Sequence, residues 1–87
     1  MAKIQKEIMI MNKQGLYARP AAMFVQIAQK YDSGVTVQKG PEKVNGKSIM
    51  GILMLGIQKG NMISVVADGN DAEQMMAELE EYLKRDE

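Results

Sequence analysis

The spacing of apolar residues along the chain predicts its secondary structure. Alternation of apolar and polar residues, the period of a strand with one buried face, predicts four strands at residues 3–11, 35–39, 42–44 and 61–68. The last of them has the pattern of a central strand. Lys6 is an exception in the first strand, because it shares a face with three isoleucines.

Apolar residues spaced three and four apart predict two long helices. One begins around Pro20, since proline is favoured in a first helical turn, and runs to about Tyr31. Its buried stripe is expected to be Ala21, Phe24, Val25 and Ala28. The other follows Gly69, with Asn70 and Glu73 spaced as a capping box. Its stripe, the clearest in the chain, comprises Ala72, Met75, Met76, Leu79, Tyr82 and Leu83.

A third helix of at most two turns is predicted between Ser48 and Gly56. Serine is a favoured N-cap, and glycine ends a helix at no steric cost in the left-handed conformation. The preceding pair Asn45-Gly46 is expected to form a turn that tolerates positive φ. Ile52 and Leu55 suffice as a core pair, so three other apolar residues should remain partly exposed: Ile49, Met50 and Leu53. Either these residues form a docking surface, or the helix is buried all round.

The predicted elements follow the order βαββαβα. Four strands with all helices on one face give an α+β fold, a two-layer sandwich. The 87 residues suffice for one domain with one core, spanning 1–87. No repeat, linker or low-complexity segment divides the chain.

The composition excludes several kinds of function. Eleven basic and eleven acidic residues cancel, which argues against direct binding of nucleic acid or of an anionic membrane. The chain has neither cysteine nor histidine, so thiolate chemistry, the commonest metal ligands and the commonest general base are absent. No segment has the length of a membrane span or the pattern of a signal peptide. We expect a cytoplasmic protein that is not an enzyme and holds neither a metal nor a cofactor.

Two predicted helix N-termini are the remaining candidates for chemistry, because such ends attract anions. Arg19 adds a positive charge at the first, and Lys47 and Ser48 add an ammonium and a hydroxyl at the second. In the simpler interpretation Arg19 is a surface residue and Ser48 is only a cap. The acidic residues Glu78, Glu80 and Glu81 are expected to form a solvated helix face. A small hydrolase of the acylphosphatase type is a distant alternative that rests on Arg19 alone.

Two segments, residues 15–22 (GLYARPAA) and 44–51 (VNGKSIMG), resemble the two signature segments of the HPr family. HPr is the small phosphocarrier of the bacterial sugar phosphotransferase system. The resemblance covers essentially the whole chain. It implies an open-faced β-sandwich with a four-stranded antiparallel sheet and three helices on one face. It also implies a phospho-accepting histidine at the position of Tyr17, next to Arg19, and a regulatory serine at Ser48 that HPr kinase/phosphorylase phosphorylates.

The chain departs from the family pattern at Tyr17. A phenol is mostly protonated at neutral pH and is a poor nucleophile, and its phosphate ester is a poor phosphoryl donor. Sugar phosphotransfer and phosphate exchange with enzyme I are therefore expected to be lost. The absence of the histidine makes the chain resemble the Crh type within the family. Proteins of the Crh type also lack this histidine, but they have glutamine at the position of Tyr17.

The Crh resemblance implies a corepressor in carbon catabolite repression that binds a CcpA-type transcription regulator once Ser48 is phosphorylated. The residues expected to face partners are Arg19, Ala22, Lys47, Ile49, Met50 and Leu53. The alternative within the family is an ordinary phosphocarrier in which tyrosine replaces the histidine at position 17.

Overall fold

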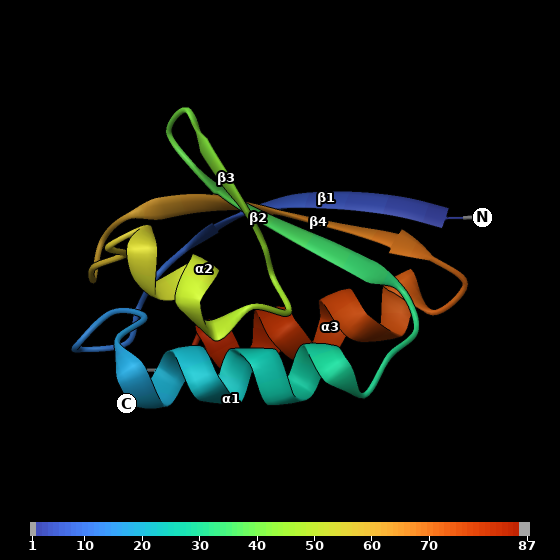
Figure 1. The fold of residues 1–87 in the computed structure, drawn as a ribbon, viewed down its shortest axis with the longest axis horizontal. Helices are drawn as coiled ribbons and strands as arrows, with labels where there is room; N and C mark the ends of the chain where they lie inside the picture. Colours follow the sequence, from blue (N-terminus) through green and yellow to red (C-terminus); the bar gives the residue numbers. More distant parts are fainter. Residues whose placement is uncertain (1, 86–87) are drawn as a thin grey trace.

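The computed structural model describes residues 2–85 and has the predicted order of elements. The elements are β1 (Ala2–Met9), α1 (Ala18–Gln29), β2 (Gly34–Lys39), β3 (Glu42–Asn45), α2 (Ile49–Met54), β4 (Met62–Gly69) and α3 (Ala72–Leu83). The sheet forms one layer and the helices form the other, with α1 and α3 side by side beneath it (Figure 1). The predicted two-layer α+β fold is confirmed.

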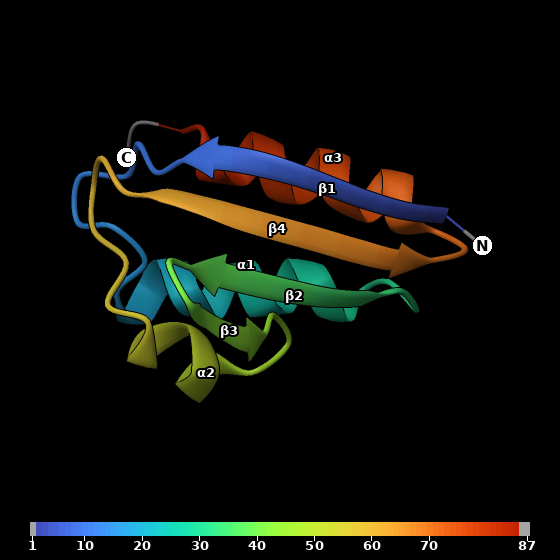
Figure 2. The same ribbon diagram turned by 90° about the horizontal axis from the view of Figure 1, so that it is seen from above.

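The four strands form one antiparallel sheet in the order β1-β4-β2-β3 (Figure 2). β4 is central, as its pattern predicts, and pairs Ile8 with Ile63 across to β1 and Val37 with Val65 across to β2. These residues point to the helical layer and are buried. The opposite face of the sheet has no covering layer among residues 2–85, which makes the sandwich open-faced.

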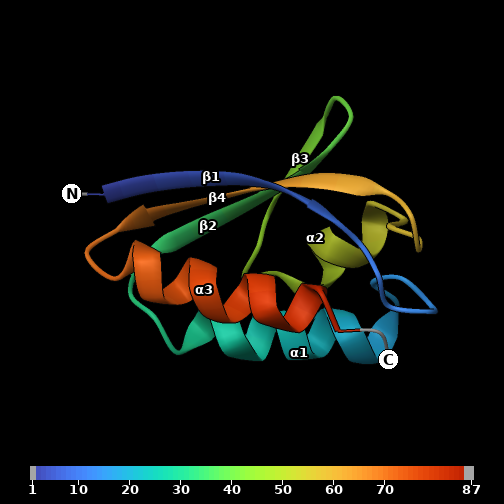
Figure 3. The ribbon, with the colours of Figure 1, turned by 180° about the vertical axis from the view of Figure 1, so that it is seen from behind.

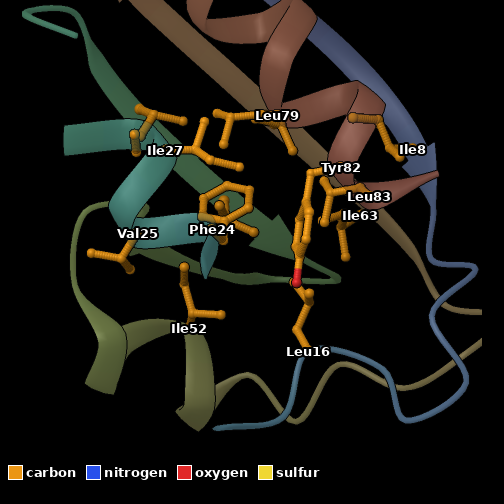
Figure 4. Packing of buried hydrophobic residues seen from close by; sticks show 14 of the residues in the cluster. Ile8, Leu16, Phe24, Val25, Ile27, Ile52, Ile63, Leu79, Tyr82 and Leu83 are labelled. Carbon is orange, nitrogen blue, oxygen red and sulfur yellow. The ribbon is translucent and has the colours of Figure 1, made fainter. Parts of the chain in front are cut away.

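The core lies between the sheet and the helices and is built mainly from aliphatic and methionine side chains. Phe24 of α1 lies among residues of α2, α3 and the sheet (Figure 4). Both predicted helical stripes are buried, and α1 also buries Ile27. Met75 and Met76 are core residues, with exposed fractions of 0% and 2%.

Lys6 breaks the apolar alternation of β1, which is an edge strand of the sheet and passes over α3 (Figure 3). Its ammonium donates to Glu80 of α3 at 2.7 Å, and Lys84 contacts the other oxygen of the same carboxylate at 3.0 Å. Both contacts lower the pKa of Glu80, and the contact with Lys6 has the larger effect. Lys6 therefore links the edge strand β1 to the helical layer.

The prediction of a solvated acidic face on α3 is correct for Glu81 but wrong for Glu80 and Glu78. Glu78 accepts hydrogen bonds from the Lys30 ammonium and the Tyr31 hydroxyl, both just beyond α1. These bonds lower the pKa of Glu78, and the bond to Glu78 raises the pKa of Tyr31. The carboxylate thus joins the two long helices.

The predicted capping box of Asn70 and Glu73 is wrong. Asp71 occupies the N-cap position of α3, and no side chain caps the helix there. The Asp71 carboxylate instead accepts from the backbone N–H groups of Asp32 and Ser33, at 2.9 Å each, and from the Ser33 hydroxyl. The same residue therefore fastens the loop after α1 to the loop before α3.

The pair Asn45-Gly46, expected to tolerate positive φ, does not use this freedom, since neither residue has positive φ. Gly46 is required for a different reason. Its N–H donates to the Val35 carbonyl at 2.8 Å, and an added Cβ would lie 2.7 Å from the Val35 side chain. Close packing against β2, rather than backbone conformation, excludes a side chain here.

Candidate functional site

Ser48 caps the N-terminus of α2, as predicted. Its backbone is extended, and its Oγ accepts from the Gly51 N–H at 3.0 Å. The Ser48 carbonyl accepts the first helical hydrogen bond from Ile52 at 3.1 Å. At the other end Gly56 takes the left-handed conformation with φ of 60°. Ser48 is half-buried, and its hydroxyl makes this one side-chain contact within the described residues 2–85.

The short helix exposes one apolar face. Ile52 and Leu55 are buried at 0% and 4% exposure, which confirms the predicted core pair. Ile49 and Met50 are 43% and 67% exposed and Leu53 is half-buried, so the alternative of a helix buried all round is wrong. Met54, which is not among the residues expected to be exposed, is 76% exposed and lies four residues, about one helical turn, beyond Met50. We call Ile49, Met50, Leu53 and Met54 the α2 patch.

Tyr17 and Arg19 lie at the N-terminus of α1 and are exposed. Tyr17 is the N-cap residue, makes no side-chain capping bond and is 69% exposed. The loop before α1 lies against the segment after α2, where the Leu16 N–H donates to the Ile57 carbonyl at 3.0 Å. A hollow of about 500 Å³ lies between them, lined by residues of both segments, including Tyr17 and Leu53. Tyr17 therefore lies near the C-terminal end of α2, whereas Ser48 is at its N-terminal end.

Lys47 is adjacent to Ser48 in sequence, but its ammonium has another partner. Its Nζ donates to the Tyr31 carbonyl at 2.8 Å, in the loop that follows α1. Lys47 therefore holds the loop before α2 against the end of α1. Ala22, the remaining predicted contact residue, is partly buried in α1.

Charge is unevenly distributed although the total is zero. Residues 8–31 and 43–67, which contain the loop before α1, both candidate sites and α2, include no aspartate or glutamate. Basic residues occur in both segments: Lys13, Arg19, Lys30, Lys43, Lys47 and Lys59. The two segments that contain Tyr17 and the α2 patch thus carry basic residues and no acidic ones.

The family model for the HPr component of the phosphotransferase system, described by its phosphorylation site, matches residues 4–85. The chain belongs to the HPr family. Proteins of this family are phosphocarrier proteins rather than enzymes, which excludes the hydrolase alternative.

Similar proteins fall into both types of the family. The HPr-like protein Crh of Halalkalibacterium halodurans is 39% identical over 95% of this chain and 99% of its own length. Crh of Bacillus subtilis is 37% identical over 95% and 98%. The crystal structure of the phosphocarrier protein HPr from Bacillus anthracis superposes with a TM-score of 0.92 at 42% identity, covering 97% of this chain and 100% of that one. Within residues 2–85 no helix has the length and hydropathy needed to cross a membrane.

Proposed function

We propose that this chain is a regulatory member of the HPr family that acts in carbon catabolite control in the cytoplasm. HPr kinase/phosphorylase phosphorylates Ser48, and the phosphorylated protein binds a CcpA-type transcription regulator as corepressor, without contacting nucleic acid itself. The observation that carries the proposal is the position of Ser48. Ser48 is half-buried and caps the N-terminal end of a helix with an exposed apolar face. The similarity of the chain to Crh proteins supports the same assignment.

A phosphate on Ser48 would be available to a partner. It would add a charge of about −1.5 to −2 at neutral pH beside the α2 patch. The ammonium of Lys47, the next residue in the sequence, donates to the Tyr31 carbonyl at the end of α1. A regulator that offers arginine or lysine together with an apolar groove would contact the phosphate and the α2 patch at once. Arg19 and Tyr17 would lie at the far end of that contact.

Tyr17 is the reason to propose regulation without phosphate transfer. The chain contains no histidine, so no neighbouring imidazole could replace the missing acceptor. A tyrosine phosphate ester lacks the reactivity of a phosphohistidine. In the proposal the protein neither receives phosphate from enzyme I nor passes it to sugar carriers.

The test is incubation with HPr kinase/phosphorylase and ATP, read by intact mass, followed by a binding assay with a CcpA-type regulator. We expect one phosphate, and binding only of the phosphorylated form. Ser48→Asn is the matched control, because asparagine cannot be phosphorylated here but is also a good N-cap residue. A folded wild-type protein that takes up no phosphate, or a phosphate that persists in Ser48→Asn, would contradict the proposal.

A second candidate is an ordinary phosphocarrier that carries tyrosine in place of histidine. The observation that favours it is the close superposition with HPr from Bacillus anthracis. Tyr17→His decides between the two. Phosphate acceptance from enzyme I by this variant would show that the surface around Tyr17 still matches that enzyme. Failure of a folded Tyr17→His protein to accept phosphate would favour a separate regulatory lineage.

A further inference from the structure

The C-terminal end of α2 is held by a lysine from the sheet. Lys39 is the last residue of β2, and its Nζ donates to the carbonyls of Leu55 and Gly56 at 3.1 Å each. The last carbonyls of a helix have no partner within the helix, and positive charge is favourable there. One ammonium therefore satisfies two carbonyl groups at the end of the α2 patch.

α2 depends on such contacts because it is too short to be stable by itself. It has six residues, and Ile52 is its one fully buried side chain. Isolated helices of this length do not persist in water, since each must first form a costly first turn. The Ser48 hydroxyl holds the N-terminal end and the Lys39 ammonium holds the C-terminal end. The exposed side chains between them are placed by these two contacts and by Ile52.

The Lys39 contact also connects α2 to the hairpin of β2 and β3. In Figure 2 this hairpin lies next to α2. The hairpin turn at Gly40 and Pro41 is exposed and directly follows Lys39. A change at the hairpin tip would therefore reach α2 through a side chain that lies outside the α2 patch itself.

We infer that Lys39 is a positioning residue for the α2 patch and for Ser48: its ammonium fixes α2 in the conformation that the kinase and the regulator recognise. The effect on α2 is independent of what the protein does. The effect on the kinase and the regulator rests on the function proposed above.

The first test is amide hydrogen exchange of wild type, Lys39→Met, Lys39→Arg and Lys43→Met. Methionine keeps most of the apolar stem and removes the charge, and Lys43 is an exposed lysine of the adjacent strand, so its variant is the matched control. In Lys39→Met we expect the helical amides of Ile52, Leu55 and Gly56 to exchange about tenfold faster, as for a lost hydrogen bond to a charged group. Lys39→Arg, which keeps the charge, should lie between this variant and wild type.

Equal exchange at these amides in Lys39→Met and Lys43→Met would overturn the inference. A uniform acceleration that includes the β4 and α1 amides would also overturn it, because Lys39 would then support the whole fold. The second test is the initial rate of Ser48 phosphorylation, which should fall in Lys39→Met and be retained in Lys43→Met. An unchanged rate would refute the coupling to the kinase while leaving the proposed function intact, whereas an unphosphorylated wild type would refute that function alone.

Discussion

Replacing Ser48 by alanine removes the hydroxyl that accepts from the Gly51 N–H at 3.0 Å. Loss of a serine N-cap lowers the free energy of unfolding by about 1 kcal/mol, within a range of roughly 0.5–2 kcal/mol. Gly51 is itself half-buried, so water has limited access to the freed N–H. We therefore expect a loss of about 1–2 kcal/mol.

The assay is thermal unfolding followed by circular dichroism, supported by urea titration. For a domain of this size 1 kcal/mol corresponds to roughly 4–8 °C, so Ser48→Ala should melt at least about 4 °C below wild type. Ser48→Asn keeps a capping oxygen and should stay within about 0.5 kcal/mol of wild type. If Ser48→Ala had the same melting temperature as wild type, or the same melting temperature as Ser48→Asn, the assignment of the hydroxyl as the cap would be refuted.

Two further predictions concern the loops that fix the helices. Gly15 has φ of 69°, and an added Cβ would lie 2.3 Å from the Ile57 carbonyl oxygen. Gly15→Ala should therefore lower the free energy of unfolding, measured in urea, by more than about 1 kcal/mol. A variant as stable as wild type would show that the loop before α1 can move away without loss of stability. The second prediction concerns Asp71, whose pKa is lowered mainly by the hydrogen bond from the Ser33 hydroxyl and then by that from the Asp32 N–H. The ionised carboxylate therefore stabilises the fold at neutral pH. This stabilisation is lost as the pH falls through the lowered pKa, below about 4. Asp71→Asn should accordingly lose less stability between pH 7 and pH 3 than wild type in urea titrations, and an equal loss would contradict the role of this carboxylate.

The elements that the sequence predicts well are those that local chemistry determines. Helical stripes, strand alternation and the cap at Ser48 depend on residues within a few positions of one another. For the same reason the exposed side of α2 could be deduced from the spacing of Ile52 and Leu55. Both were buried as expected, with Ile49 and Met50 left exposed.

The contacts that the sequence does not predict join residues far apart in the chain. Asp71 has the chemistry of a cap, but its partners are 38 and 39 positions away, and Lys6 meets Glu80 at a separation of 74. The pattern of β4 likewise predicts a central strand but does not define that its neighbours are β1 and β2. At the candidate site the ammonium groups of Lys39 and Lys47 bind backbone carbonyls, for which no side-chain motif exists.

The lysine that interrupts the alternation of β1 also bears on how copies of this protein behave at high concentration. β1 is an edge strand of eight residues, and within residues 2–85 no strand lies beside its outer backbone groups. Such an edge is a template for pairing with another chain, and an inward-pointing charge is one of the features that oppose this. A strand added beside β1 would have to cover the ammonium of Lys6 and its contact with Glu80. The charge of Lys6 is therefore a feature of the kind that opposes edge-to-edge pairing of β1.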